Sequence, residues 1–345
     1  MADKKRIIFI MNPISGTARK SGIPRIIEDT LDKEYYDYTI TKTQHSGHAY
    51  EIACEARDGG AYAAVAVGGD GTVNEVARAL VHSDTALGIL PCGSGNGLAR
   101  HLMLPLEPRK AVAILNSHTI HELDYGIINE IPFFCTCGMG FDAFISMKFA
   151  EAGKRGPVTY LENILREGLK YKPETYEIKD GNGTSLCRAF LISCANASQY
   201  GNNAYIAPQA SMSDGLLDVT IMEPFDMLEA PQLSIDMFNK TIDKNPKIKT
   251  FKTKHIHVHR QQAGFIHYDG EPVMTSADVD ISVVNKGIKI IVNPEAKKEK
   301  RQPGMMQTTF SVFFNDIMNV RADKSKQIHR IQTLNKILLK KLNNL

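Results

Sequence analysis

Short apolar segments alternate with amphipathic segments over the first 120 residues. The apolar segments are predicted strands and span residues 6–11, 36–43, 63–69 and 86–91. Between them, apolar positions recur with helical spacing at residues 24–31, 47–57 and 73–81. This alternation predicts a parallel sheet whose strands are connected by helices.

From about Asp124 the pattern becomes mostly strand-like. Predicted strands with turn signals between them fall within residues 122–143, 188–197, 215–223, 255–260, 278–285 and 288–293, with helical interludes near 157–169 and 224–239. Such a run of strands predicts a β-rich second domain. We therefore divide the chain into an α/β domain (1–123), a β-rich domain (124–295) whose last strand can return to the first domain, and a tail (296–345).

Composition fits a globular chain, and charge is concentrated at its end. The 345 residues are 43% hydrophobic and 23% charged, which leaves room for two domains. The net charge of +3 is too small to indicate a nucleic-acid-binding protein. Residues 297–345 carry eleven Lys or Arg against three Asp or Glu, a net charge of +8 that leaves −5 for the rest.

The six cysteines show no CxxC spacing, and most lie within apolar segments. They predict reduced, buried thiols rather than disulfides or a zinc site. The N-terminal residues lack the apolar region of a secretory signal, and no apolar run has the length of a membrane span. We therefore expect a cytoplasmic protein whose membrane contact is peripheral, at the inner membrane surface.

Three loops follow the predicted parallel strands, at residues 12–16, 68–72 and 91–100. Ligands of such sheets bind beyond the carboxyl ends of the strands, so these loops are the candidate site. In the second loop, glycines allow an anion to approach the backbone closely, and Thr72 with Glu75 fits a capping box that starts a helix. Asp70 would then hold or position Mg²⁺ on bound phosphates, although it could also order a turn, and Glu75 could simply cap the helix.

The third loop, "PCGSGNGLAR", alternates glycines with Ser94 and Asn96, whose polar groups can bond a nucleotide. It is not a Walker A loop, and Leu98 stands where a GxGxxG fingerprint requires glycine.

Together and in this order, "NPISG", "GGDGTVNE" and "PCGSGNGLAR" resemble the catalytic domain of diacylglycerol kinases, sphingosine kinases and soluble bacterial lipid kinases. The resemblance extends through "GMGFDA", "DGLLDV" and "YDGEPV" and covers about residues 5–295. It implies an N-terminal α/β domain related to NAD kinases and phosphofructokinases, a C-terminal β-sandwich, and ATP in the cleft between them.

The resemblance also implies roles for individual residues. Asp70 would serve Mg²⁺, and Asp269 would be the general base for the lipid hydroxyl, with Glu271 close by. The alternative for "YDGEP" is an ordinary Asp-Gly turn between strands. The implied ATP-binding residues are Asn12, Ser15, Gly16, Gly68, Gly69, Asp70, Gly71, Thr72, Glu75, Gly93, Ser94, Gly95 and Asn96.

In bacterial members of the family, the loop that contains Asp214 and Asp218 can hold a structural cation, although an Asp-Gly turn explains the same residues. Gly97 stands where diacylglycerol kinases usually have aspartate, which makes the loop more like that of sphingosine kinases. The aspartate that holds the lipid amine in sphingosine kinases aligns with Phe144, with Asp142 nearby. Both lipid classes therefore remain open.

Two further patterns have simpler alternatives. In "HIHVH", His255, His257 and His259 share one strand face, a spacing that could bind a transition metal, but a solvent-facing strand edge is the favoured interpretation. The tail ends in an amphipathic basic helix, which predicts either a membrane-surface helix, or packing on its own domain or in a homodimer.

These features predict an ATP- and Mg²⁺-dependent lipid kinase that acts on a sphingoid base, diacylglycerol or a related lipid. The alternatives are an NAD kinase, which shares "GGDG", and a catalytically silent regulator that binds nucleotide or lipid.

Overall fold

The computed structural model describes residues 3–13, 20–152, 171–181, 183–226 and 229–296. Its N-terminal half contains parallel strands in the order β2-β1-β3-β4. These strands are β1 (Lys5–Met11), β2 (Tyr36–Lys42), β3 (Ala63–Gly68) and β4 (Ala86–Pro91). The helices of this half are α1 (Ile23–Thr30), α2 (His48–Asp58), α3 (Asp70–Leu80), α4 (Gly97–His101) and α5 (Pro108–Leu115), with a 3-10 turn at Lys20–Gly22.

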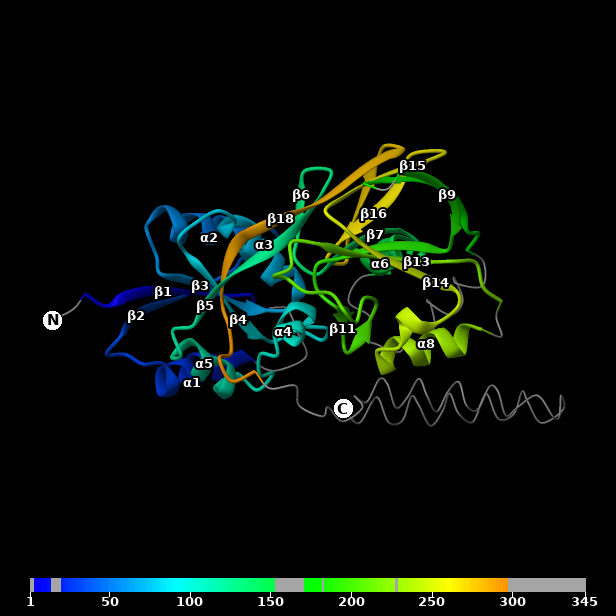
Figure 1. Cartoon of the computed structure of the whole chain (residues 1–345). Coiled ribbons are helices and arrows are strands. Elements are labelled where there is room, and N and C mark those ends of the chain that lie inside the picture. The colour runs from blue at the N-terminus through cyan, green and yellow to red at the C-terminus, as the bar shows by residue number, and fades with distance from the viewer. Residues whose placement is uncertain (1–2, 14–19, 153–170, 182, 227–228, 297–345) are drawn as a thin grey trace, which may run out of the picture.

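Helices cover both faces of this parallel sheet (Figure 1). Helices α2 and α3 pack on the face that presents Ile10 and Ala66, and α1 and α5 pack on the face that presents Phe9 and Val65. All residues of β3 and β4 are consequently buried, which explains their uninterrupted apolar sequences. The predicted α/β domain with a parallel sheet is confirmed.

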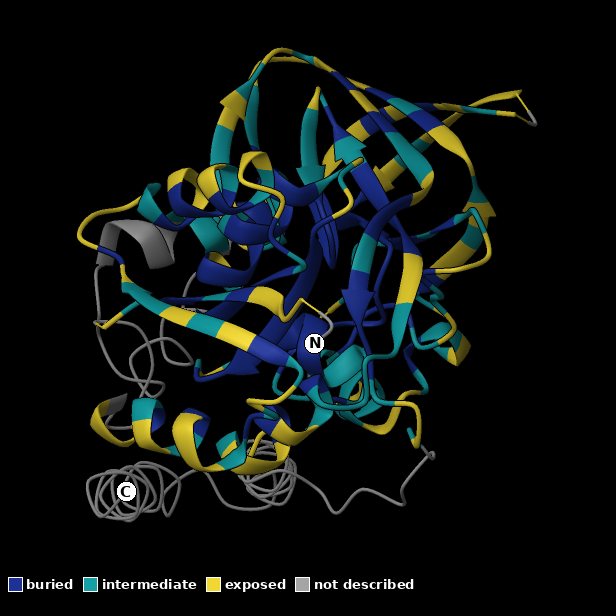
Figure 2. Ribbon diagram, turned by 90° about the vertical axis from the view of Figure 1, so that its left-hand side faces the viewer, coloured by how far each residue is buried: buried dark blue, intermediate teal, exposed yellow. Residues whose placement is uncertain are grey.

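The C-terminal half is a β-sandwich, as predicted. One layer is an antiparallel sheet in the order β14-β13-β10-β7-β16-β17, and the other contains β15, β8 and β9. Figure 2 shows the buried core along the strands and exposed positions on the outer turns and helices. Its elements are β6 (Ile131–Phe133), β7 (Thr136–Gly140), α6 (Phe141–Ala152), β8 (Glu174–Asp180), β9 (Gly183–Ala189), β10 (Leu191–Ala195), β11 (Gln199–Gly201), β12 (Ala204–Tyr205), β13 (Leu217–Met222), α8 (Ala230–Asn239), the 3-10 turn Ile242–Lys244, β14 (Ile248–Thr253), β15 (His255–Arg260), β16 (Gly264–Tyr268) and β17 (Glu271–Thr275).

Two long strands, β5 (Ile120–Ile128) and β18 (Asp278–Ile291), connect the halves. One end of β18 pairs with β15 of the sandwich, and the other end pairs in parallel with β4 at Ile290 and Leu87. Strand β5 runs antiparallel along β18. The first sheet therefore continues into the sandwich, and Figure 1 shows both strands crossing between the halves.

Several local predictions differ from the structure. Helix α3 begins at Asp70 rather than after Thr72, and no side chain caps its N-terminus, so the predicted capping box is wrong. Helices α4, α5 and α6 were not predicted. Helix α4 has only five residues, and α6 follows a tight turn at Gly140, where φ is +84°. The helix expected near residues 157–169 and the amphipathic tail lie outside the described residues.

The histidines of β15 do share an outward face, but β15 lies between β18 and β8 and is not an edge strand. Their rings pair with Asp278 and Asp280 of the neighbouring strand instead of converging on one point. The six cysteines are free, as predicted, but Cys54 and Cys187 are only partly buried. Among the described residues, none of the helices has both the length and the apolar character needed to cross a bilayer.

Candidate active site

The second and third glycine loops lie against each other at the carboxyl ends of β3 and β4. The backbones of Gly69 and Gly93 approach so closely that a Cβ on Gly93 would lie 2.5 Å from the Cα of Gly69. Position 93 therefore requires glycine, whereas a Cβ on Gly69 would make a tight contact of 3.2 Å with the Gly93 Cα. This contact brings the start of α3 next to the loop at residues 93–97.

Asp70 binds the third loop through its side chain. Its two carboxylate oxygens accept hydrogen bonds from the backbone amides of Asn96 (2.8 Å) and Gly97 (2.6 Å). Burial raises the pKa of Asp70, the two amide hydrogen bonds oppose this rise, and the charge of Asp269 adds to it. Asp70 thus orders the third loop, and its role toward Mg²⁺ stays a prediction.

Asn96 closes the same loop on itself. Its side chain accepts a hydrogen bond from the Gly93 amide at 2.9 Å and donates one to the Gly93 carbonyl at 2.7 Å. The backbone of Asn96 is left-handed, with φ of +52°, a conformation that asparagine tolerates better than most residues. Ser94 lies exposed in the same loop.

The "YDGE" segment forms the turn between β16 and β17. Tyr268 pairs with Glu271, and Asp269 and Gly270 both have positive φ, which makes this a two-residue hairpin turn. The Asp269 carboxylate accepts four hydrogen bonds, from the amides of Phe134 (2.9 Å), Cys135 (2.7 Å) and Thr136 (3.1 Å) and from the side chain of Asn74 (2.8 Å). Burial raises the pKa of Asp269, and these hydrogen bonds oppose the rise.

The turn at Asp269 therefore lies next to the glycine loops. Asn74 belongs to α3, and a methyl group in place of the Gly71 hydrogen would lie 3.5 Å from Glu271 Oε1. Asn74 stands inside the "GGDGTVNE" motif, but sequence reasoning assigned it no role. The signal that could have identified it is a polar residue between Val73 and Val76 on the buried side of the helix, where it requires a partner.

The hairpin of β11 and β12 completes the surroundings of the third loop. The Asn202 amide donates to the Gly95 carbonyl at 3.1 Å, and Arg100 Nε donates to the same carbonyl at 2.9 Å. A Cβ on Gly97 would lie 3.3 Å from the Tyr200 carbonyl oxygen. Close packing therefore accounts for the glycine at position 97. Arg100 and Asn202 were not recognised from the sequence.

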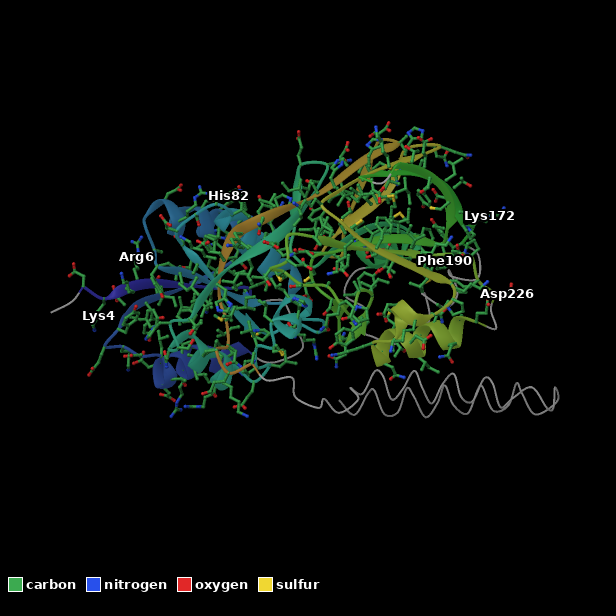
Figure 3. All side chains as sticks on the ribbon, in the orientation of Figure 1. Lys4, Arg6, His82, Lys172, Phe190 and Asp226 are labelled. Carbon is green, nitrogen blue, oxygen red and sulfur yellow. The ribbon has the colours of Figure 1, made fainter. Side chains whose placement is uncertain are left out.

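Asp142 and Phe144 lie behind the Asp-Gly-Glu turn. The Asp142 carboxylate faces His267 Nε2 at 2.9 Å and accepts hydrogen bonds from the Tyr200 hydroxyl and the Ala143 amide. Phe144 joins an aromatic cluster inside the second domain, where Figure 3 labels Phe190. Asp142 is therefore already bound by groups of the protein.

Only some of the other predicted ATP-site residues lie near the glycine loops. The Asn12 side chain donates a weak hydrogen bond to Thr72 Oγ1 at 3.4 Å, near the glycine loops, whereas Ser15 and Gly16 lie outside the described residues. Glu75 points to α2, where its carboxylate accepts the amides of Gly47 and Ala49, each at 3.1 Å. Glu75 thus caps a helix, but the neighbouring one rather than its own.

Asp214 and Asp218 are brought together, but a lysine lies between them. Lys252 Nζ is 2.8 Å from Asp214 Oδ2 and 3.0 Å from Asp218 Oδ2. Asp214 Oδ1 accepts the Leu216 amide at 3.1 Å, as in the alternative turn interpretation. An ammonium group thus takes the position between the carboxylates, so these residues do not suit a divalent cation.

The residues around Asp70 do suit Mg²⁺. Each Asp70 oxygen keeps a second lone pair beside its amide hydrogen bond, and the Glu271 carboxylate lies beside the same end of α3. Hard divalent cations prefer such oxygen ligands and are commonly held with phosphates.

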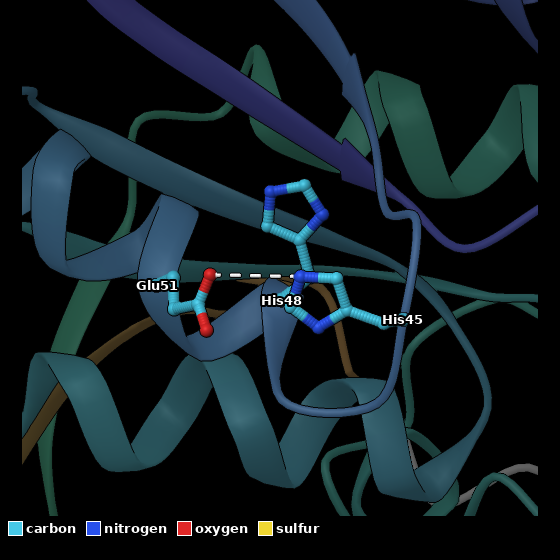
Figure 4. Close-up of side chains that lie close together, drawn as sticks. All are labelled: His45, His48 and Glu51. Atoms are coloured by element: carbon cyan, nitrogen blue, oxygen red, sulfur yellow. Dashed lines mark ion pairs between the residues drawn. The ribbon is translucent and has the colours of Figure 1, made fainter.

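A separate group of possible metal ligands lies at the start of α2, with His45 in the preceding loop and His48 and Glu51 in the first turns of the helix (Figure 4). The ligand atoms of His45, His48 and Glu51 lie within 4.8 Å of one another, and the imidazole rings stack at 4.6 Å. However, His48 Nδ1 accepts the Gln44 amide at 2.9 Å, so the proton of the neutral ring is on Nε2. His48 therefore offers no free nitrogen, and the group is incomplete as a metal site.

Comparison with known proteins agrees with this geometry. Residues 6–128 match the diacylglycerol kinase catalytic domain, and residues 136–292 match the YegS C-terminal NAD kinase beta sandwich-like domain. A probable lipid kinase YegS-like protein of Chromohalobacter salexigens is 30% identical over 239 residues, which covers 68% of this chain and 77% of the relative. The probable lipid kinase YegS of Escherichia fergusonii is 28% identical over 263 residues, covering 74% of this chain and 86% of the relative.

A solved structure of a putative diacylglycerol kinase from Bacillus anthracis str. Sterne shares the fold. Its TM-score is 0.69 at 22% identity, and the match covers 84% of this chain and 96% of that chain. The two matched domains together span most of the described residues, in the order that the structure displays. The chain therefore belongs to the family of proteins that join a diacylglycerol kinase catalytic domain to a YegS-type C-terminal domain.

Proposed function

We propose that this protein is a lipid kinase that transfers the γ-phosphate of ATP to a lipid hydroxyl with the help of Mg²⁺. The observation that carries the proposal is the meeting of three motifs from distant parts of the chain. Asp70 binds the loop at residues 93–97, and Asn74 of the same helix binds Asp269. The family relatives named as probable lipid kinases support the same reaction class.

Phosphoryl transfer needs positioning and charge neutralisation more than covalent chemistry. The glycine loops allow phosphates to approach the backbone, and the first N–H groups of α3 favour negative charge there. Asp70 fixes the shape of the third loop, and Mg²⁺ bound near Asp70 and Glu271 would neutralise charge on the transferred group. The Glu271 carboxylate, which follows the turn at Asp269, lies beside the first turn of α3, where phosphates would bind.

For the acceptor, we propose a neutral lipid such as diacylglycerol in preference to a sphingoid base. A sphingoid amine requires a free carboxylate, and the Asp142 carboxylate is already bound by His267, Tyr200 and Ala143. Gly97, which resembles sphingosine kinases, is explained by its contact with Tyr200.

The alternatives are less well supported. An NAD kinase would share the "GGDG" loop, but the match to the diacylglycerol kinase catalytic domain covers residues 6–128. A silent regulator would have little need for three carboxylates that lie together at Asp70, Asp269 and Glu271.

The test is transfer of labelled γ-phosphate from ATP to sphinganine, diacylglycerol, monoacylglycerol and NAD, with Asp70→Asn as the blank. Label in diacylglycerol supports the proposal in full, and label in sphinganine corrects the acceptor. Label only in NAD, or in no acceptor despite ATP binding, would contradict a lipid kinase.

We also propose that the protein works in the cytoplasm at the inner membrane surface, through its basic tail. The tail carries a net charge of +8, which favours anionic headgroups. Deletion of residues 300–345 should abolish binding to anionic vesicles while turnover of a detergent-dispersed lipid continues. Unchanged vesicle binding, or a dimer that dissociates on deletion, would favour the homodimer alternative.

A further inference from the structure

A buried histidine, His267, lies against the turn between β16 and β17. Its side chain is 2% exposed, and its Nε2 is 2.9 Å from Asp142 Oδ2 at the start of α6. The amide of Gly270, in the turn itself, donates a long hydrogen bond of 3.4 Å to His267 Nδ1. Because Nδ1 accepts a hydrogen bond, the proton of the neutral ring is on Nε2, which donates it to Asp142. His267 thus connects α6 to the turn.

Asp142 can reach His267 because the strand beneath it carries a glycine. Gly138 of β7 pairs with His267 of β16. A Cβ on Gly138 would lie 2.6 Å from Asp142 Oδ2 and 2.6 Å from the Ile192 carbonyl oxygen. Only glycine leaves room for the carboxylate at this place. The first glycine and the aspartate of "GMGFDA" are therefore both explained by the contact between Asp142 and His267.

A tyrosine extends this connection to the third glycine loop. The Tyr200 hydroxyl donates a hydrogen bond of 3.2 Å to Asp142 Oδ2, and the Tyr200 ring lies 6.3 Å from the ring of His267. The carbonyl of the same tyrosine packs against Gly97. Tyr200, Asp142 and His267 therefore form a continuous chain of contacts between the third glycine loop and Gly270.

This chain holds the turn from the side opposite to α3. On the α3 side, Asn74 donates a hydrogen bond to Asp269. On the α6 side, the contact is made by the ring of His267. Buried polar networks whose members are hydrogen-bonded are rigid, and a displacement of about 1 Å at a reacting centre can lower a rate by about 10²-fold. Groups that fix the turn therefore have a direct influence on the transfer step.

We propose that Asp142 and His267 are positioning residues for phosphoryl transfer. Asp142, held by Tyr200, keeps the imidazole in the form protonated on Nε2, and Nδ1 of this form holds the Gly270 amide and with it the turn that faces the glycine loops. The pair acts through the turn and exchanges no proton with the substrate. This assignment rests on the proposed lipid kinase function.

A purely structural role for His267 makes a different prediction. In that role the histidine would only satisfy Asp142, so activity would fall in parallel with stability. Two replacements separate the roles. The amide of His267→Gln lies near the position of Nε2 and can donate to Asp142, but it offers Gly270 no acceptor. The amide oxygen of His267→Asn lies near the position of Nδ1 and can accept from Gly270, but its side chain is too short to reach Asp142.

The test measures kcat, ATP affinity and melting temperature for both variants of the full-length protein, with kcat taken below each melting temperature. His267→Gln should have the higher melting temperature of the two and yet the lower kcat, about 10- to 10²-fold below the wild type, with unchanged ATP affinity. His267→Asn should melt at a lower temperature and keep a kcat closer to that of the wild type. The controls are His259→Gln and His259→Asn, whose histidine pairs with Asp278 on the outward face of β15, and they should behave as the wild type. A kcat that follows the melting temperature, with His267→Asn the slower variant, would overturn the proposal.

Tyr200→Phe provides a milder test that keeps the aromatic ring. Loss of one hydrogen bond to Asp142 should lower kcat by about 3- to 10-fold. Because both residues act through Asp142, the double variant of Tyr200→Phe and His267→Gln should have a kcat within about threefold of His267→Gln alone. An unchanged kcat in Tyr200→Phe, or losses that multiply in the double variant, would contradict the proposed chain. A wild-type protein that labels no lipid would instead overturn the proposed function itself.

Discussion

The side chain of Asn74 donates a hydrogen bond of 2.8 Å to the carboxylate of Asp269, from the first domain to the turn of the second. Asn74 is 4% exposed, and the aspartate that it binds is held on its other side by three consecutive backbone amides. This single bond therefore ties the helix behind the "GGDG" loop to the turn between β16 and β17. The relative position of the two motifs depends on it.

Replacement of Asn74 should expose this dependence. Asn74→Ala removes one of four donors and should lower the free energy of unfolding by about 1–3 kcal/mol. Asn74→Asp should lower the free energy of unfolding further, because it places a second negative charge next to Asp269. Urea unfolding and kcat would be measured for both variants, and equal stability of Asn74→Asp and the wild type would contradict the arrangement.

Asp70→Asn should disturb the third loop and, through it, ATP binding. An amide retains one acceptor oxygen, so either the Asn96 or the Gly97 amide loses its partner. Charge-assisted hydrogen bonds are worth about 1.5–3 kcal/mol, and a loss of this order is expected in the free energy of unfolding. Calorimetric titration with ATP should show weaker binding. Asp84→Asn, at an exposed surface ion pair with Lys289, is the control that should change neither quantity.

The pH dependence of this stability loss has a definite sign. Burial raises the pKa of Asp70, so the folded protein binds a proton at higher pH than the unfolded chain. The contribution of Asp70 to the free energy of unfolding is therefore largest below its unfolded-state pKa. It decreases as the pH rises through its folded-state pKa. The stability difference between the wild type and Asp70→Asn should thus be larger at pH 4 than at pH 7. A difference that grows with pH would contradict the raised pKa.

Gly97→Asp would introduce the residue that diacylglycerol kinases usually have, and it should destabilise this protein. Its Cβ would meet the Tyr200 carbonyl at 3.3 Å and the Gln199 carbonyl at 3.4 Å. Overpacking of this kind typically lowers stability by about 1–3 kcal/mol. Gly22→Ala, where no atom lies within 4 Å of the new Cβ, is the control. A Gly97→Asp protein with wild-type melting temperature and a changed lipid preference would show that this position does report on the lipid.

Hydrophobic periodicity was sufficient to predict the two halves of the fold. Residues 63–68 and 86–91 are continuously apolar because helices cover both faces of the sheet, and this pattern is visible in the sequence. The glycine loops could be predicted too, because close backbone approach leaves glycine as the only choice at positions such as Gly93. These features leave a direct signature in the local sequence.

Partners that are distant in sequence could not be predicted. Glu75 has the spacing of a capping box, but its carboxylate binds the amides before α2, which only the packing of α2 on α3 brings within reach. Likewise, the sequence around Asp214 and Asp218 is compatible with a cation site. The lysine that pairs with them, Lys252, is placed opposite Asp218 only by the pairing of β13 with β14. Such long-range neighbours decide what a side chain does.

The last prediction concerns Lys252 and the structural cation that the family resemblance implies near Asp214 and Asp218. Its ammonium lies between Asp214 and Asp218, and Asp218 has only 13% of its side chain exposed. Burial raises the pKa of Asp218, and Lys252 opposes this rise. The positive charge that the two carboxylates need is therefore supplied by the chain itself.

The wild type should consequently keep its melting temperature when EDTA or millimolar Mg²⁺ is added. Lys252→Met leaves two neighbouring carboxylates without a counter-ion and should lower the free energy of unfolding by about 1–2 kcal/mol, a value between those of exposed and buried ion pairs. Added Mg²⁺ should restore part of this loss only in the variant, because the emptied position can then accept a cation. Lys249→Met on the same strand, whose lysine pairs with Glu223, is the matched control and should show no response to Mg²⁺. A wild-type protein that loses several degrees of melting temperature in EDTA would instead show that a bound metal, rather than Lys252, stabilises this loop.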